Sequence, residues 1–209
     1  STLVWKTATI MLWNANSGPG CSDTPGVSHL PRIDPLLWVG NEVSAAHGTY
    51  DVVISTVMPV DKHGCPAPQL TTHSVMFKDG QGNETKRGIE VARRCIFEGV
   101  AHVANAIAAG KRVLVHCAWG QNRSCAICCA FAVLHRGLPA YDAISYVRER
   151  NLAERSYHGQ QPPGGAMHNK AFRQIVVDMQ CERDAALVGS RVTATEVSTR
   201  TVVEAKTVE

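Results

Sequence analysis

A short apolar run, RVLVH at residues 112–116, lies between two stretches that each carry a helical pattern. In the stretch before it, apolar residues recur in steps of four, three and four, at Ile96, Val100, Val103 and Ile107. This spacing predicts one buried face of a helix over 84–109, and Gly110 stands where a helix is commonly capped. The stretch after the run, 123–137, predicts a buried helix that ends at Gly137. A continuous apolar strand between two helices is typical of a central strand buried on both faces of a sheet.

Further elements can be assigned on either side of this unit. We expect strands over 32–41, 50–57 and 72–77, and an additional edge strand over 1–14. After the unit, helices are predicted over 139–151 and 168–184, with a loop between them. Strands followed by helices around a buried strand predict an α/β (α+β) domain, with a central, mostly parallel sheet flanked by helices.

The chain divides into three parts on this basis. We assign an N-terminal extension to residues 1–30, one folded domain to 31–182 and a tail to 183–209. The tail contains few bulky apolar residues. We therefore expect it to be flexible or to add an edge strand to the sheet.

The composition narrows the function classes. Of the 209 residues 44% are hydrophobic, and the formal net charge is only +3. This charge does not indicate nucleic-acid or membrane binding, although it suits an anionic ligand. We find no apolar run of bilayer length and no signal-peptide pattern at the N-terminus. The eight cysteines, four of them within 117–129, therefore predict reduced thiols in a cytoplasmic compartment.

The loop that follows the central strand has the chemistry of an anion site. A turn from a strand into a helix directs backbone N–H groups inward, and the helix N-terminus adds partial positive charge. Gly120 permits a backbone angle that other residues resist. Such a nest favours the thiolate form of Cys117, and the guanidinium of Arg123 can bind two oxygens of a phosphate. The predicted phosphate-binding residues are Ala118, Trp119, Gly120, Gln121, Asn122 and Arg123.

These residues also carry a likeness to a known family. The segment HCAWGQNRS, residues 116–124, resembles the HCxxGxxRS signature of the cysteine-dependent protein phosphatases, in particular the dual-specificity group. The segments IDPLLWVGNEVSAA, SVMFKDGQ, AISYVRERN and NKAFRQI resemble other parts of the same domain. The likeness extends over about 33–181, and it implies the family's fold with the phosphate-binding loop between the central strand and a helix.

The resemblance implies a role for each site residue. Cys117 would be the nucleophile and form a phosphocysteine intermediate, while Arg123 would bind phosphate and stabilise the transition state. Ser124 would donate its hydroxyl to the departing sulfur, and His116 would organise the loop. Asp79 would protonate the leaving oxygen and then act as base on the attacking water. No metal ion and no cofactor is implied.

Two candidates exist for the general acid. Asp79 follows the apolar strand SVMF after one residue, Lys78, in the place of the family's acid, but it lies further from Cys117 than is usual. Glu84 lies nearer to the usual spacing, and we favour Asp79. The chain also departs from the family in the bulky Trp119, which we expect to point away from the phosphate, and in the longer connection over 151–168.

Other reactive residues have simpler interpretations. The spacing of Cys125 and Cys128 matches a C-x-x-C motif, but we expect both to pack inside a helix together with Cys129. A disulfide between one of them and Cys117 stays open as a redox hypothesis. The remaining histidines of interest show no metal-ligand spacing; they are His135, His158 and His168.

The function hypothesis that follows is a protein phosphatase acting on phosphotyrosine and phosphoserine/threonine, with a phosphorylated protein as its partner. An RNA 5′-triphosphatase uses the same kind of loop, but the residues after Arg123 and the weak charge disfavour it, so nucleic acid is an unexpected partner. A phosphoinositide phosphatase would carry lysine in the loop. A non-catalytic phosphate-binding module is a further alternative, although such modules usually lose the nucleophile that is present here as Cys117.

Overall fold

The structure of the chain is a computed structural model. It describes residues 26–47, 49–57, 71–80, 85–157 and 165–206, with side chains in the last helix described as far as residue 188. The predicted strand over 1–14 and the alternative acid Glu84 lie outside these residues, as does His158.

The centre of the described structure is a five-stranded sheet with the order β1-β2-β5-β3-β4. Its strands are β1 (Ser28–His29), β2 (Leu37–Gly40), β3 (Val52–Ser55), β4 (Thr71–Ser74) and β5 (Val113–His116). All neighbours run parallel except β1, which pairs antiparallel with β2. The predicted mostly parallel sheet is therefore confirmed.

Strand β5 holds the middle of the sheet, as its sequence predicts. All four of its residues are buried, because helices cover the sheet and the strand has neighbours on both sides. In the register, His116 lies opposite both Gly40 of β2 and Ser55 of β3. The carboxyl ends of these three parallel strands therefore meet at one edge, directly before Cys117.

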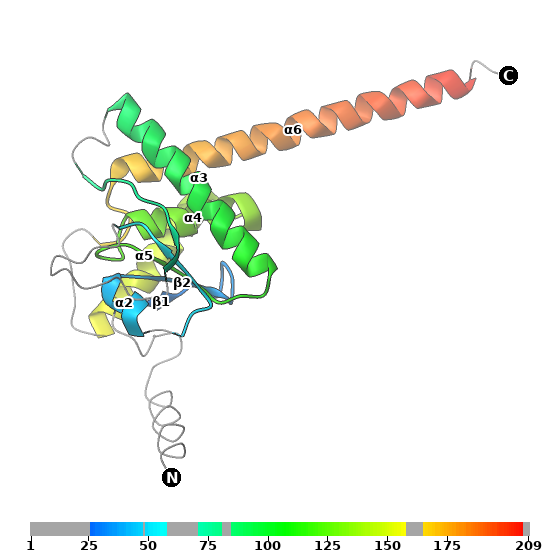
Figure 1. Cartoon of the computed structure of the whole chain (residues 1–209). Coiled ribbons are helices and arrows are strands. Elements are labelled where there is room, and N and C mark those ends of the chain that lie inside the picture. Colours follow the sequence, from blue (N-terminus) through cyan, green and yellow to red (C-terminus); the bar gives the residue numbers. More distant parts are fainter. Residues whose placement is uncertain (1–25, 48, 58–70, 81–84, 158–164, 207–209) are drawn as a thin grey trace, which may run out of the picture.

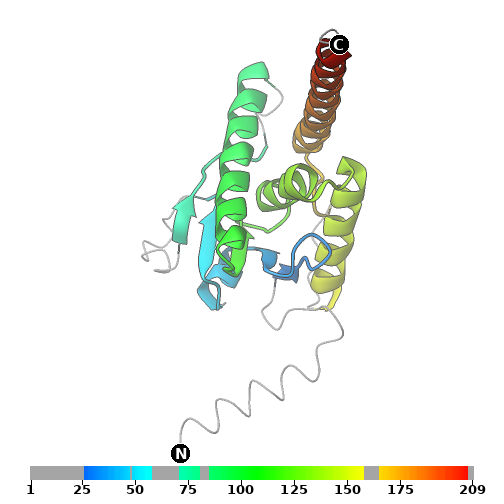
Figure 2. The ribbon, with the colours of Figure 1, turned by 90° about the vertical axis from the view of Figure 1, so that its right-hand side faces the viewer.

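Within the described part of the chain, five helices pack around the sheet (Figure 1). They are α2 (Glu42–His47), α3 (Lys86–Ala108), α4 (Arg123–Arg136), α5 (Ala140–Tyr157) and α6 (Lys170–Lys206). Helix α4 packs against α3, α5 and α6, and Figure 2 shows it between α3 and α5. This position buries every residue of α4 from Ser124 to Val133. None of the described helices combines the length and apolar character needed to cross a lipid bilayer.

Two sequence predictions differ from the structure. Helix α5 continues to Tyr157, beyond its predicted end at 151. The edge strand expected as one alternative after 183 is wrong, because α6 runs without a break to Lys206 and extends away from the other elements (Figure 1). The physical reason is that helix growth is far easier than helix nucleation. The first turns of α6 are anchored by buried Phe172, Ile175 and Met179, and no proline follows to stop the helix.

Gly99 allows α3 and α4 to approach each other closely. A Cβ atom at this position would lie 2.5 Å from Cδ1 and 2.9 Å from Cγ1 of Ile127, which is fully buried in α4. Because Ile127 is enclosed by the core, it has no free space into which to move. The contact between these two helices therefore depends on the absence of a side chain at 99.

We expect Gly99→Val to lower the free energy of unfolding by about 1–3 kcal/mol through overpacking. The gain in helix propensity, roughly 0.5 kcal/mol, is too small to offset this loss. Urea denaturation measures the effect. Ile127→Val removes one of the clashing carbons, so it should cost less in the Gly99→Val background than in the wild type. Additive effects of the two substitutions would contradict the packing argument.

Candidate active site

The loop between β5 and α4 surrounds the sulfur of Cys117. Only 2% of this residue is exposed. Its Sγ accepts a hydrogen bond from the backbone N–H of Gly120 at 3.1 Å and another from the hydroxyl of Ser124 at 3.3 Å. Both donors direct partial positive charge at the sulfur, and donors of this kind stabilise a thiolate.

Gly120 gives the loop its shape. Its φ angle is +65°, and a Cβ atom there would lie 2.8 Å from the backbone C and O of Gly40. A side chain is therefore excluded both by the backbone angle and by the end of β2. The carbonyl of Gly120 accepts hydrogen bonds from Asn151 Nδ2 at 3.0 Å and from Cys125 Sγ at 3.3 Å. The loop is thus fixed to β2, α4 and α5 at one residue.

Arg123 begins α4, and backbone carbonyl groups orient its side chain. Nη1 donates to the carbonyl of Thr56 after β3 at 2.9 Å and to that of Phe77 after β4 at 3.3 Å. Within the described residues both side-chain hydrogen bonds of Arg123 use Nη1, and the buried Nε has no partner. Nε and Nη2 therefore keep N–H donors for an anion. A planar guanidinium held in this way is suited to two-point binding of phosphate oxygens.

His116 is a buried neutral residue behind the loop. Burial and the positive charge of nearby Arg123 lower its pKa from 6.5 to about 4, although the backbone of Cys117 partly opposes this shift. Neither ring nitrogen makes a hydrogen bond to a residue of the described ranges. Its carbonyl accepts instead, from the N–H of Thr56 at 3.0 Å and the hydroxyl of Thr56 at 3.1 Å. His116 therefore links the end of β5 to Thr56, whose carbonyl holds Arg123.

The connection before α6 joins the loop to Asp79. Nδ2 of Asn169 donates to Oδ1 of Asp79 at 3.0 Å, and the N–H of Asn169 donates to Oδ1 of Asn122 at 3.1 Å. Asn122 Nδ2 is also 3.0 Å from Nε2 of His168. Asp79 itself is exposed and lies two residues after Phe77, whose carbonyl contacts Arg123. The structure thus brings Asp79 to the loop through an asparagine bridge.

Sequence reasoning missed three contributors to this site, Asn151, His168 and Asn169. One signal was available for Asn169, because asparagine before a helical pattern is a common N-cap. Its Oδ1 does accept from the N–H of Ala171 at 3.0 Å. Nothing in the local sequence indicates that the other end of the same amide would reach Asp79, 90 residues earlier.

The remaining residues of interest lie where the sequence places them. Trp119 is 71% exposed, in agreement with a side chain directed away from the loop centre. Cys125, Cys128 and Cys129 are fully buried in α4 and form no disulfide within the described residues. Burial raises the pKa of both Cys128 and Cys129, so these thiols stay protonated. Within the described ranges, no three His, Cys, Asp or Glu side chains group as metal ligands.

The low pKa of His116 predicts a pH dependence of stability. The unfolded chain takes up a proton near pH 6.5, whereas the folded chain does so only near pH 4. Stability should therefore fall as the pH drops from 6.5 to 4, at up to about 1.4 kcal/mol per pH unit and by roughly 3 kcal/mol in total. The free energy of unfolding, measured by urea denaturation at each pH, should change less steeply with pH in His116→Asn than in the wild type. If the free energy of unfolding changed equally steeply with pH in both proteins, burial of His116 would not be the cause of the pH dependence.

Comparisons with known proteins agree with this geometry. A family model described as the dual specificity phosphatase catalytic domain matches residues 39–158. Human DUSP28 is 20% identical, with 77% of this chain and 96% of that chain covered at a TM-score of 0.52. A mouse dual specificity phosphatase complexed with zinc tungstate is 20% identical, with 83% of this chain and 97% of that chain covered at a TM-score of 0.54. The human tyrosine phosphatase-like serine/threonine/tyrosine-interacting protein is 20% identical, with 79% of this chain and 99% of that chain covered at a TM-score of 0.50.

At these identities the solved structures establish a shared fold, and the family model carries the assignment. It spans more than half of the 209 residues and includes β5, the loop at Cys117 and α4. This chain therefore belongs to the dual specificity phosphatase family.

Proposed function

We propose that this protein hydrolyses phosphate monoesters of tyrosine, serine and threonine side chains in proteins, through a phosphocysteine intermediate. The observation that carries the proposal is the pair of hydrogen bonds to Cys117 Sγ, from Gly120 N–H and the Ser124 hydroxyl. A buried sulfur with two donors, placed at the N-terminus of a helix beside a guanidinium, is arranged to attack the phosphorus of a bound phosphate group.

The first step transfers the phosphoryl group to sulfur. The Cys117 thiolate attacks phosphorus, the S–P bond forms and the bond to the side-chain oxygen of the substrate breaks. Arg123 and the loop N–H groups bind the oxygens of the phosphoryl group as charge moves onto them. Asp79 gives its proton to the leaving oxygen. The carbonyls of Thr56 and Phe77, which hold Nη1, support this orientation of Arg123.

The second step returns the enzyme to its starting state. Water attacks phosphorus, the Asp79 carboxylate takes a proton from that water, and the S–P bond breaks to release inorganic phosphate. The hydroxyl of Ser124 donates to the sulfur as it regains negative charge, in line with its 3.3 Å contact. The chemistry requires no metal ion or cofactor.

Two features favour a protein substrate. The side chains of the loop positions Ala118, Trp119, Gln121 and Asn122 are uncharged. They therefore offer no extra cation for the additional phosphates of an inositol lipid or an RNA 5′-triphosphate. The exposed indole of Trp119 adds an apolar surface beside the loop, which suits the flank of a peptide more than that of a polyanion.

We expect Cys117→Ser to lose at least about a thousandfold in kcat, with p-nitrophenyl phosphate and with phosphopeptides, because the serine hydroxyl is not ionised. Cys181→Ser is the matched control, since Cys181 is an exposed free thiol outside the site. Rapid acid quench of Ser124→Ala should trap the phosphorylated Cys117. Turnover of RNA 5′-triphosphate ends with none of phosphopeptides would refute the proposed substrate class.

We expect Asp79→Asn to lower kcat by about 10²- to 10⁴-fold for substrates with a poor leaving group, and much less for p-nitrophenyl phosphate. The inflection that the general acid causes in the pH–rate profile should disappear as well. If Glu84→Gln gave this pattern and Asp79→Asn did not, Glu84 would be the acid.

The bridge from Asn169 can be separated from its capping role. Asn169→Ser keeps a helix-capping oxygen but cannot reach Asp79, so stability should change little. Loss of one hydrogen bond should lower kcat roughly three- to tenfold for the poor leaving group. If Asn169→Ser lowered kcat by the same factor in an Asp79→Asn background, Asn169 would not act through Asp79.

A further inference from the structure

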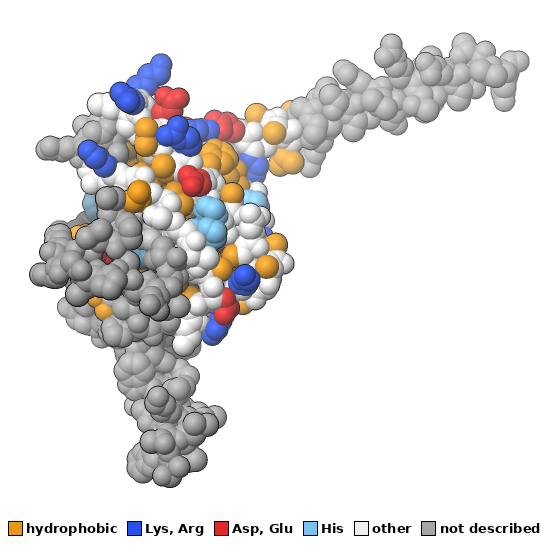
Figure 3. Space-filling model, in the orientation of Figure 1, with side chains coloured by type: hydrophobic (Ala, Val, Ile, Leu, Met, Phe, Trp, Pro, Cys, Tyr) orange, Lys and Arg blue, Asp and Glu red, His pale blue; other side chains and the backbone are white. Residues whose placement is uncertain are grey.

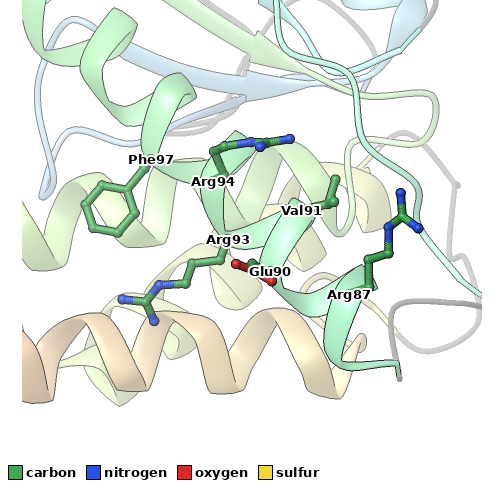
Figure 4. A pocket seen from close by; sticks show the side chains of 6 residues that line it. All are labelled: Arg87, Glu90, Val91, Arg93, Arg94 and Phe97. Atoms are coloured by element: carbon green, nitrogen blue, oxygen red, sulfur yellow. The ribbon is translucent and has the colours of Figure 1, made fainter.

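A groove runs along the first turns of α3, outside the site described above. It has a volume of about 530 Å³ and is lined by Arg87, Glu90, Val91, Arg93, Arg94 and Phe97 (Figure 4). Basic side chains gather at this N-terminal end of α3 in the space-filling view (Figure 3). We call this surface the α3 groove. It combines guanidinium groups with exposed apolar side chains, since Val91 is 37% and Phe97 41% exposed.

The basic residues of the groove are not explained by the stability of the helix. The first turn of α3 contains no acidic residue, but it does contain Lys86 and Arg87. Positive charge at a helix N-terminus opposes the helix dipole and is therefore unfavourable. Arg87 is thus in an unfavourable position within the isolated chain. An anionic partner bound in the groove would turn the same charge into a favourable one.

Two of the three arginines in the groove remain available for a partner. Arg93 pairs with Glu182 of α6, and its guanidinium carbon lies 5.7 Å above the ring of Phe97. Arg93 therefore forms the side of the groove that faces α6. Arg87 and Arg94 form no ion pair within the part of the chain that the structure describes. In Figure 4 their guanidinium groups lie on the side of α3 that Val91 occupies. Glu90 supplies one negative charge against these cations.

The position of the groove relates it to the substrate. Arg87 follows Asp79 by only eight residues, and Asp79 is the proposed acid. Helix α6 and the residue that caps it contact both places, because Asn169 donates to Asp79 and Glu182 pairs with Arg93. Arg87 and Arg94 are seven residues apart, or about 10 Å along the helix axis. This separation lies between two and four residues of an extended peptide, which are the spacings at which its side chains point to the same face.

We propose that the α3 groove binds an acidic stretch of the protein substrate, with two carboxylates four residues apart and an apolar side chain midway between them, all on one face of the extended peptide. The carboxylates bind Arg87 and Arg94, and the apolar side chain covers Val91. This inference rests on the proposed function, because it specifies the substrate class of the same site.

The test compares phosphopeptides that differ only in the flanking stretch, which is either acidic or replaced by glutamine and lysine. Wild-type protein should show about tenfold higher kcat/KM for the acidic peptide, and the preference should shrink with added salt. Arg87→Glu/Arg94→Glu should lose this preference or favour the lysine peptide. Its kinetics with p-nitrophenyl phosphate should not change. Lys111→Glu, an exposed charge reversal just beyond the other end of α3, is the matched control.

A stability measurement separates docking from structure. Arg87→Glu alone should leave the unfolding midpoint unchanged or raise it, because an acidic residue suits the first turn. A lower midpoint together with slower p-nitrophenyl phosphate turnover would mean that the arginines act through the fold, and the docking proposal would be wrong.

Peptide binding provides a readout that does not depend on catalysis. The unphosphorylated acidic peptide should bind Cys117→Ser more tightly than the lysine peptide, by fluorescence anisotropy, and the double charge reversal should abolish this difference. Equal binding of both peptides, or displacement by an RNA oligonucleotide at the same concentration as by the acidic peptide, would overturn the proposal. If the wild-type protein did not hydrolyse p-nitrophenyl phosphate, that result would instead count against the proposed function.

Discussion

The close approach of Gly120 to Gly40 is the constraint on which the site depends. No side chain fits at Gly120, because its Cβ would lie 2.8 Å from the backbone of Gly40. This contact sets the loop against the end of β2, where the N–H of Cys117 also donates to the carbonyl of Gly40 at 3.3 Å. With the loop in that position, the N–H of Gly120 reaches the sulfur. The Cys117 sulfur thus owes its surroundings to a contact between two backbones.

The rest of the molecule keeps these groups in place before any substrate binds. Backbone carbonyls after two different strands hold Arg123, and α5 holds the loop through Asn151. Site groups that are oriented in advance need no reorganisation during the reaction, which is how electrostatic stabilisation becomes effective. Buried His116 is neutral near pH 7, because its pKa is about 4. It therefore adds no charge of its own behind the Cys117 sulfur.

Helix α6 connects the chemistry to recognition in the two proposals. Its N-cap Asn169 contacts Asp79, and Glu182, about three and a half turns further on, contacts Arg93 at the α3 groove. The same helix, together with its N-cap, therefore contacts the proposed acid and one side of the groove. A peptide that extends from the phosphorylated residue toward α3 would meet both. Exposed side chains provide this surface, whereas the enclosed α4 provides the packing behind it.

The sequence alone determined the features that depend on neighbouring residues. The apolar run of β5, the helical period of α3 and the Cys117–Arg123 loop were predictable because each is a local pattern. The end of α6 was not, since its continuation depends on the anchoring of its first turns in the core. Only the tertiary structure placed Asn169 at Asp79 and Asn151 at Gly120, across 90 and 31 residues. Contacts between distant side chains are decided by how whole helices pack, and no local pattern records that packing.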